Sequence, residues 1–433
     1  MRHSSRLHSS RHGRWLRTAS RRKVELVVEA ASELALCRPD PEAGPDIIED
    51  GSVAVHQGRI VAVGKKRELR RRFRGQTVIE ARGRLVTPAF VDPHTHLMFA
   101  GSREDELELK LEGRSYIEIL KAGGGILRTV EQTRKAGLEK LVSGASNTLD
   151  RMLLHGTTTV EVKSGYGLTL RDEVKSLKAI KELNLRHSVD VVPTFMGAHA
   201  LPPEFPDTAS YTDHIVKEML PQVAQLRLAK FCDVFCEKDV FSIEDSRRLL
   251  SEAKLRSMKP KIHADELSRL GGAELAAEVR ATSADHLIHA SEKGLDNMAR
   301  AGVVAVLMPG TSLVMMSDRY ADASGMMSRG IPIALATDFN PNCMLENMQL
   351  VIALAVYRLQ LKPIQALRAA TINSAAALNV SESVGSLETG KKADLLVFEE
   401  KSHRFLGYHF GANSVHTVVK DGRIVVEGFK LAG

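Results

Sequence analysis

Two histidines separated by one residue, His94 and His96, are the clearest chemical signal in this sequence. They follow an apolar lead-in at residues 90–92. If that segment is a β-strand, alternate side chains point to the same face, so both imidazoles can face one centre and bind a metal ion. A His-x-His pair alone is weak, because the chain contains 16 histidines. The pair needs support from elsewhere in the chain.

That support comes from polar residues at the ends of later apolar runs, namely His199, Glu237, His263, Asp265, His286 and Asp338. His263 and Asp338 would complete a four-residue set with His94 and His96. Neutral imidazoles and one carboxylate suit zinc or iron, and a site with an open position can carry a reactive water. The sequence therefore predicts one metal ion held by these four side chains.

Eight apolar runs alternate with long amphipathic stretches between residues 88 and 339. The runs are residues 88–96, 157–164, 190–199, 231–237, 259–265, 283–289, 303–310 and 331–339. This alternation predicts βα units around a parallel sheet, and eight units match a closed (β/α)8 barrel. An open doubly wound sheet is the alternative. In the barrel, working groups lie at the carboxyl ends of the strands, where these polar residues fall.

Short strands and turns occupy both ends of the chain. The segments "QGRIVAVG" and "DGRIVVEG" resemble one hairpin used twice, and each half alone would expose sheet edges. We therefore predict an α/β protein with three parts. Residues 24–87 and 385–433 form a composite β-sandwich, residues 88–384 form the barrel, and residues 1–23 are a disordered extension.

The net charge of +7 is concentrated in residues 1–23, which contain no Asp or Glu. This extension has a single aromatic residue, Trp15, and no binding module, so no nucleic-acid partner is predicted; a targeting role is the alternative to disorder. No apolar run is long enough to span a membrane. The four cysteines form no Cys-x-x-Cys pair, which favours reduced thiols and a cytoplasmic location. A homodimer is the default expectation for such an enzyme.

Several motifs together carry a family resemblance. "PAFVDPHTHLMFAGSRE", "HADE", "SADHL" and "ATDFNP" resemble the amidohydrolase superfamily of metal-dependent barrel enzymes. Within it, "AGGGI", "VEVKSGYGL", "PTFMGAHALP" and "HADELSRLGGAELAAE" resemble the imidazolonepropionases of histidine degradation, over roughly residues 45–430. The resemblance implies one Zn²⁺ or Fe³⁺ ion per subunit and hydrolysis of 4-imidazolone-5-propanoate to N-formimino-L-glutamate. Another cyclic amidohydrolase or a ring deaminase is the enzymatic alternative, and a non-catalytic binding barrel is the distant one.

Hydrolysis of a ring amide needs a proton carrier and a group that stabilises the developing negative charge. Asp338, by analogy with the superfamily, and Glu266, close to His263, are both candidate bases, and the sequence does not choose between them. Glu266 is also a candidate partner for a ring nitrogen. His286 is placed to polarise the carbonyl oxygen.

The substrate's propanoate carboxylate calls for a planar cation, which Arg103 supplies. The resemblance places Arg103, Tyr166 and His199 in the substrate pocket, with Asn340 near Asp338. One departure stands out: many family members have Gly-Ser or Gly-Thr after "DFNP", and this chain has Asn342 and Cys343. We expect these two to contact substrate as a subfamily variant.

Two other motifs resemble sites of different enzyme classes. Lys163 could be mistaken for the carbamylated lysine that bridges two metals in some relatives, but that lysine lies on the fourth strand, where this chain has residues 235–237. One metal is therefore predicted. The glycines 123–125 lack the Lys-Ser or Lys-Thr of a phosphate-binding loop, and a mobile active-site loop is predicted instead.

Overall fold

Eight parallel strands form the sheet that carries the site, in a computed structural model that describes residues 21–40, 46–114, 118 and 124–432. The strands are β6 (Phe90–Asp92), β7 (Thr157–Lys163), β8 (Asp190–Ala198), β9 (Phe231–Cys236), β10 (Lys259–Ala264), β11 (Ser283–His286), β12 (Val304–Leu307) and β13 (Ile333–Leu335). Each pairs in parallel with its neighbour in chain order, so that the strand order follows the sequence. The His96 N–H donates to the Phe339 carbonyl at 2.8 Å and joins the first strand's end to the last. The barrel is confirmed, and the open doubly wound alternative is excluded.

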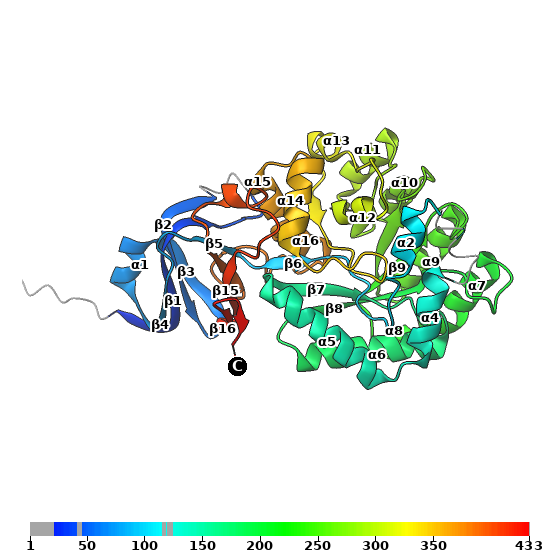
Figure 1. Ribbon diagram of the computed structural model, residues 1–433, viewed down its shortest axis with the longest axis horizontal. Helices are drawn as coiled ribbons and strands as arrows, with labels where there is room; N and C mark the ends of the chain where they lie inside the picture. The colour runs from blue at the N-terminus through cyan, green and yellow to red at the C-terminus, as the bar shows by residue number, and fades with distance from the viewer. Residues whose placement is uncertain (1–20, 41–45, 115–117, 119–123, 433) are drawn as a thin grey trace, which may run out of the picture.

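Helices surround this barrel (Figure 1). They are α2 (Glu106–Leu111), α4 (Gly125–Lys135), α5 (Leu138–Leu154), α6 (Leu170–Arg186), α7 (Thr208–His214), α8 (Leu220–Gln225), α9 (Ile243–Leu255), α10 (Gly272–Glu278), α11 (Glu292–Ala301), α12 (Pro309–Val314), α13 (Ala323–Ser328), α14 (Met348–Arg358), α15 (Pro363–Ala369) and α16 (Ile372–Ala377), with a π-helical turn at Ile215–Met219. Local signals set their limits: Thr169 caps α6 by accepting from the Asp172 N–H, and Gly302 ends α11 in the left-handed region. On α5, Leu141, Ala145 and Leu149 share one buried face.

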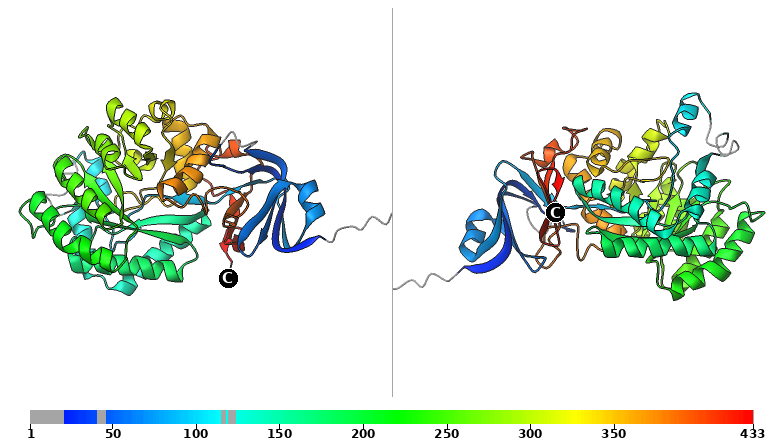
Figure 2. Two further views of the ribbon diagram at one scale, coloured as in Figure 1. Left: turned by 180° about the vertical axis from the view of Figure 1, so that it is seen from behind. Right: turned by 60° about the horizontal axis from the view of Figure 1, so that its bottom comes forward.

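Both ends of the chain build a second sheet beside the barrel, so the blue and red strands lie together in Figures 1 and 2. Its strands are β1 (Arg22–Ala35), β2 (Ile47–His56), β3 (Arg59–Lys65), β4 (Phe73–Glu80), β5 (Leu85–Pro88), β14 (Leu395–Phe398), β15 (Val415–Lys420), β16 (Arg423–Glu427) and β17 (Lys430–Leu431), with the helix α1 (Lys66–Arg72). Strands β5 and β14 pair antiparallel and join the two halves. The prediction that the termini meet in one β-unit is confirmed.

An irregularity in strand β1 lets the terminal sheet curve around a hydrophobic core of its own. Ala30 has φ of 63°, and the register shifts between Val28 and Ala31. The first half of β1 therefore pairs with β4, and its second half pairs with β5. Leu34 from the N-terminal half and Val397 from the C-terminal half share the core that results.

The two similar sequence segments do form equivalent hairpins. Gln57-Gly58 joins β2 to β3 with φ of 51° and 71°, and Asp421-Gly422 joins β15 to β16 with φ of 48° and 76°. Two consecutive positive φ angles are typical of type I′ turns. The turns also contact one another, because a Cβ on Gly422 would lie 3.0 Å from the Gly58 Cα. Glycine at both positions allows this approach.

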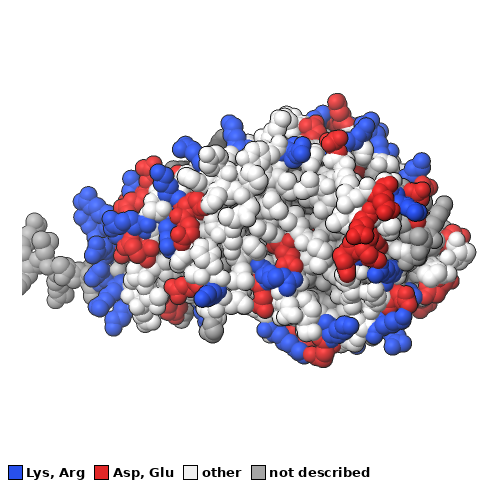
Figure 3. Space-filling model, viewed as in Figure 1, with Lys and Arg blue, Asp and Glu red and all other residues white. Residues whose placement is uncertain are grey.

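Surface charge is mixed over most of the face in Figure 3, with Lys and Arg gathered at the end formed by α1 and β4. The exposed arginines there are Arg67, Arg70, Arg71, Arg72 and Arg74. The predicted N-terminal extension lies outside the described residues except for its last three, of which Arg22 and Lys23 begin β1. Every helix in the described part of the chain is too short or too polar to cross a membrane.

Candidate metal centre and active-site cavity

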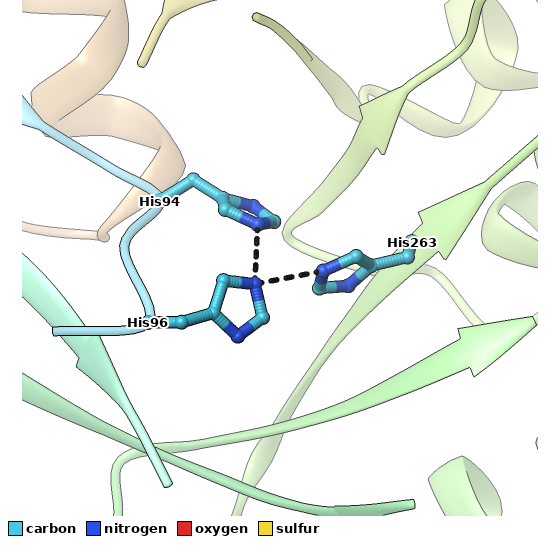
Figure 4. A group of neighbouring side chains, drawn as sticks. All are labelled: His94, His96 and His263. Carbon is cyan, nitrogen blue, oxygen red and sulfur yellow. Dashed lines mark hydrogen bonds between the residues drawn. The ribbon is translucent and has the colours of Figure 1, made fainter. Parts of the chain in front are cut away.

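Three imidazoles meet at the carboxyl ends of the barrel strands (Figure 4). His94 and His96 follow β6, and His263 lies in β10. The Nε2 atom of His96 is 3.2 Å from the Nε2 of His94 and 3.2 Å from the Nε2 of His263. Asp338, just after β13, places Oδ1 3.6 Å from His94 Nε2 and 3.7 Å from His96 Nε2. The structure thus brings together all four residues that the sequence predicts as metal ligands.

The ends of β6 and β13 are tied together beneath this group. Asp92 accepts from the Thr337 hydroxyl at 2.5 Å and from the Thr337 N–H at 3.2 Å. The Asp338 N–H donates to the His94 carbonyl at 3.1 Å. These bonds fix the backbone on both sides of the centre, so His94 and Asp338, 244 residues apart in the chain, bring their side chains to one point.

The residues fit a bound metal ion. Burial lowers the pKa of His94 and His96 well below the ordinary range, so both rings are neutral and keep a nitrogen lone pair. His94 Nδ1–H donates to Asp285 at 2.6 Å, and His263 Nδ1–H donates to Asp233 at 3.2 Å. These bonds leave the Nε2 lone pairs facing the common centre, as in metal sites whose histidines are oriented by carboxylates.

Glu266 and His286 lie on one side of the centre. Their side chains approach to 3.4 Å between Glu266 Oε2 and His286 Nε2. Burial raises the pKa of Glu266 well above its usual range, and the Asp338 and Glu237 carboxylates raise it further. Burial lowers the pKa of His286, so this ring is neutral. The two predicted catalytic groups therefore form a pair that can hold or move a proton.

Backbone strain gathers at the same edge of the barrel. Asp265, His286 and Asp338 have φ of 50°, 75° and 52°, in the left-handed region. Residues other than glycine adopt this region seldom, and such residues cluster at functional sites. Three strand ends thus turn sharply at the edge of the cavity, and two of them, at His286 and Asp338, place their side chains in its lining.

A cavity of about 110 Å³ opens above the centre. Its lining includes six of the residues predicted to bind substrate, which are Arg103, Tyr166, His199, Glu266, Asn340 and Asn342. Ile126, Phe235, Leu267 and Met315 complete the apolar part of the wall, and sequence reasoning missed them. No pattern marks these four, because they come from four separate places in the chain: helix α4, strand β9, the loop after β10 and the end of helix α12.

Arg103 is a buried cation with an unused donor. Its side chain is 6% exposed, and its Nε lies 3.9 Å from Glu106 Oε2. Among the described residues, this buried Nε–H has no hydrogen-bond acceptor. A buried guanidinium that lines a cavity and keeps a free N–H is suited to bind a carboxylate.

His199 and Tyr166 form the opposite part of the wall. His199 Nδ1–H donates to the Gly165 carbonyl at 2.9 Å, and its ring stacks on His96 with centroids 4.7 Å apart. Burial lowers the pKa of His199 to about 3, so the ring is neutral. Gly165 has φ of 110°, and a Cβ there would lie 2.9 Å from His199 Nδ1. Glycine at this position therefore lets His199 approach the loop.

The loop after Asp338 is held by Asn340, which accepts from the N–H groups of Asn342 and Cys343 at 2.7 and 3.0 Å. The side-chain amide oxygen of Asn342 accepts from the Lys110 ammonium. Cys343 is fully buried, with its thiol 3.8 Å from the Thr337 carbonyl. It is not among the lining residues of the cavity. The structure thus brings Asn342 to the cavity wall and leaves Cys343 behind it.

Two other strand-end carboxylates have structural contacts. Asp265 accepts from four backbone N–H groups, of Leu270, Gly271, Gly272 and Ala273, at 2.9 to 3.1 Å. Glu237 accepts from the Leu267 N–H at 2.8 Å and from Ser268. They fix the loop that carries Glu266.

The glycine segment 123–125, predicted as a mobile loop, is described only from Gly124 onward. Gly124 and Gly125 begin α4, and the Gly125 N–H donates to Glu106 at 2.7 Å; Gly123 lies outside the described residues.

Sequence reasoning also missed a layer of buried charge beneath the histidines. It consists of Glu161, Lys163, Asp233, Lys261 and Asp285, all with no exposed side-chain area. The Lys163 ammonium lies 2.7 Å from both Glu161 and Asp233, and these two carboxylates raise its pKa against the effect of burial. The sequence does contain a sign of this layer, because the charged residues Glu161 and Lys163 lie two positions apart within an apolar run and Asp285 lies in "SADHL".

Comparison with known proteins gives a consistent picture. The amidohydrolase family model matches residues 85–425. The chain is 50% identical over 386 residues to the imidazolonepropionase of Alkaliphilus oremlandii, covering 88% of this chain and 91% of that protein. It is 49% identical over 421 residues to the imidazolonepropionase of Symbiobacterium thermophilum, covering 95% and 99%.

Solved structures show the same fold at low identity. An adenosine deaminase from Xanthomonas campestris with bound zinc superposes with a TM-score of 0.72 at 20% identity, covering 95% of each chain. The guanine deaminase of E. coli superposes with a TM-score of 0.69 at 17% identity, covering 93% of this chain and 98% of that one. At such identity the likeness concerns the fold.

Proposed function

We propose that this chain, which belongs to the imidazolonepropionase family of amidohydrolases, hydrolyses 4-imidazolone-5-propanoate to N-formimino-L-glutamate. The observation that carries the proposal is one cavity lined by two complementary kinds of group. His96, His263 and Asp338 line one part of it, and the buried Arg103 guanidinium lines another. The first suits a metal-assisted hydrolysis and the second suits the substrate's carboxylate.

His94, His96, His263 and Asp338 would hold one ion per subunit, either Zn²⁺ or Fe³⁺. When bound, such an ion supplies Lewis acidity and lowers the pKa of a water toward neutrality. Asp338 is well placed as a ligand, because Thr311 donates to its Oδ2 at 2.7 Å while Oδ1 faces the histidines.

We assign the main proton transfer to Glu266. Both oxygens of Asp338 are engaged, whereas Glu266 lies outside the ligand set and, within the described part of the chain, has its ion pair with His286. A carboxylate with a raised pKa can take a proton from the attacking water and pass it to the leaving ring nitrogen. The neutral His286 would donate to the carbonyl oxygen as negative charge develops there.

Arg103 would bind the propanoate group, and Asn342 would contribute its amide. Because the Asn342 oxygen accepts from Lys110, its NH₂ group is the part that can face a ligand. Tyr166, His199 and Asn340 shape the remaining wall. The substrate's flat ring would then lie between this wall and Glu266.

Formation of N-formimino-L-glutamate by purified protein, with elemental analysis of the same sample, tests the proposal directly. We expect turnover with about one equivalent of zinc or iron per chain. Turnover of guanine or hydantoin in place of the imidazolone would overturn the substrate assignment and favour another cyclic amidohydrolase or a ring deaminase.

We further propose a cytoplasmic location and a homodimer. Four free, buried cysteines support a reducing compartment. Light scattering of the purified protein tests the dimer, and a monomer mass would contradict it.

A further inference from the structure

The strongest unexplained feature of this barrel is the buried charge layer Glu161, Lys163, Asp233, Lys261 and Asp285. Three carboxylates face two ammonium groups in a part of the barrel with no solvent contact. Burying charge is costly unless each group is paired. Because apolar side chains would fill the same space without this cost, the layer calls for a role beyond packing.

The layer is connected directly to two of the three histidines. Asp285 accepts from His94 Nδ1–H at 2.6 Å, and Asp233 accepts from His263 Nδ1–H at 3.2 Å. His96 differs, since its buried Nδ1 has no hydrogen-bond partner among the described residues. Two ligand rings therefore depend on the positions of Asp233 and Asp285.

Lys163 is the group that these two carboxylates share. Its Nζ lies 2.7 Å from Asp233 Oδ2 and 4.0 Å from Asp285 Oδ2. Glu161, 2.7 Å away, holds the ammonium from its other side and is itself bound by the Thr194 hydroxyl at 2.5 Å. Lys261 lies 3.3 Å from Glu161 and 3.6 Å from Asp285, closer to Asp285 than Lys163 does, and it donates to the Pro93 carbonyl at 2.8 Å. Among the ion pairs of the described residues it has none with Asp233, so Lys163 is the cation that holds Asp233.

We propose that Lys163 is a positioning residue for the metal centre: it anchors Asp233 and, together with Lys261, Asp285, so that His263 and His94 keep their Nε2 atoms directed at one point. Without the ammonium, Asp233 loses its main partner and can turn away from His263. The remaining carboxylates would then face a single cation. The affinity for the ion should fall even though Lys163 touches neither the ion nor the substrate.

This inference rests on the metal dependence in the proposed function, and its test reads metal binding and not turnover. Lys163→Met removes the charge with little change in shape. Lys420→Met is a matched control, because Lys420 is 2% exposed and lies within 3.1 Å of Asp190, Asp394 and Asp421 on the other side of the molecule. Apo forms of both variants and of the wild type are titrated with Zn²⁺ against a chromophoric chelator, and with Co²⁺ by absorption spectroscopy.

We expect Lys163→Met to bind Zn²⁺ about 10- to 100-fold more weakly than the wild type and to show a shifted Co²⁺ spectrum. Lys420→Met should match the wild type in both. Asp233→Asn should also weaken binding, and adding Lys163→Met to it should cost much less than the sum of the single effects, because both act through His263. Should Lys163→Met not fold, Lys163→Gln, which keeps an N–H donor toward Asp233, takes its place in the series.

Wild-type Zn²⁺ affinity and Co²⁺ spectrum in a folded Lys163 variant would overturn the inference, as would an equal loss in Lys420→Met. Neither result would touch the proposed reaction, which the wild-type product assay decides. A wild type that binds zinc but makes no N-formimino-L-glutamate would refute the substrate and leave the role of Lys163 standing.

Discussion

Each end of the barrel holds a buried lysine with three carboxylates near it, and the two clusters do different work. Toward the carboxyl ends of the strands, Lys163 and its partners have no exposed side-chain area and contact two histidines. At the opposite end, Lys420 of β15 binds Asp190, the first residue of β8, at 3.0 Å. Here Asp190 and Asp421 are 37% and 47% exposed.

The difference shows how position in the fold, and not residue type, gives a charge cluster its role. Strands of a closed barrel direct their carboxyl ends toward a common centre. Charged side chains there can therefore orient the histidines that point into that centre. The amino ends meet the terminal sheet, where Lys420 and Lys392 bind Asp190 and fasten the two parts together. Substitutions at the carboxyl end of the barrel should change metal binding or turnover, and substitutions at the amino end should change the free energy of unfolding.

The largest effect should come from His263→Ala. Removal of one of three imidazoles should abolish stoichiometric metal binding and reduce turnover to background. A chelator should lower the melting temperature of the wild type, since a ligand at 1,000 times its Kd stabilises the folded state by about 4 kcal/mol, and should leave the variant unchanged. Full metal content in the variant would contradict the assigned ligand set.

Glu266→Gln should lower kcat about 100- to 10,000-fold with metal content unchanged. The matched control is Glu278→Gln on α10, an exposed glutamate away from the cavity, which should behave as wild type. In the wild type, kcat/KM should fall toward acid as Glu266 takes up a proton, at a pH above the ordinary 4.5 because burial raises this pKa. A normal kcat in the variant would shift the role of base to Asp338.

Arg103→Ala should raise KM about 10- to 100-fold, because a charge-assisted hydrogen bond to the carboxylate is lost. Arg103→Lys should recover only part of the affinity, since lysine lacks the planar pair of donors. For a substrate analogue with an amide in place of the carboxylate, the wild type and Arg103→Ala should have similar KM values. Equal losses for both compounds would point to a structural role for Arg103.

Lys420→Met should leave kcat and KM unchanged and lower the free energy of unfolding by about 1 to 3 kcal/mol, less than for a fully buried pair because two of its partners are partly exposed. Chemical denaturation measures the loss. A change in KM without a loss of stability would break the contrast between the two ends of the barrel.

Cys343→Ser should have the smallest effect, a change in KM of less than about twofold, which is under 0.5 kcal/mol. The thiol lies behind Asn340 and is not among the lining residues of the cavity. A large change in KM would restore the substrate contact that the sequence comparison led us to expect for Cys343.

Much of the site could be predicted because it lies at strand ends. Each strand of this barrel is an apolar run, and the end of such a run can be recognised in the sequence. His94, His263 and Asp338 lie at such ends and therefore stand out without knowledge of the fold. Arg103 and Asn342 required the family resemblance, since they lie on loops whose path depends on tertiary packing. The same dependence explains why Cys343 was expected at the cavity and lies behind it.

The charge layer could not be predicted in this way. The sequence does not show which side chain a Glu, Lys or Asp inside an apolar strand will contact. That depends on the closed barrel, which sets which interior side chains lie at the same height along its axis. Glu161 and Lys163 lie on the same strand, β7, but the contact of Lys163 with Asp233 reaches β9, on the far side of β8, and so depends on how these strands are aligned. The register between strands is a property of the whole sheet.

By itself the sequence determined the eight βα units, the meeting of the two termini and the four candidate metal ligands, because periodicity and residue type are local properties of a chain. Tertiary structure alone decided which polar side chains meet, that Lys163 lies beneath two histidines, and that Lys420 joins the sheet to the barrel. Pairing buried charges depends on distances of a few ångströms between segments far apart in the chain, and only the closed barrel sets those distances.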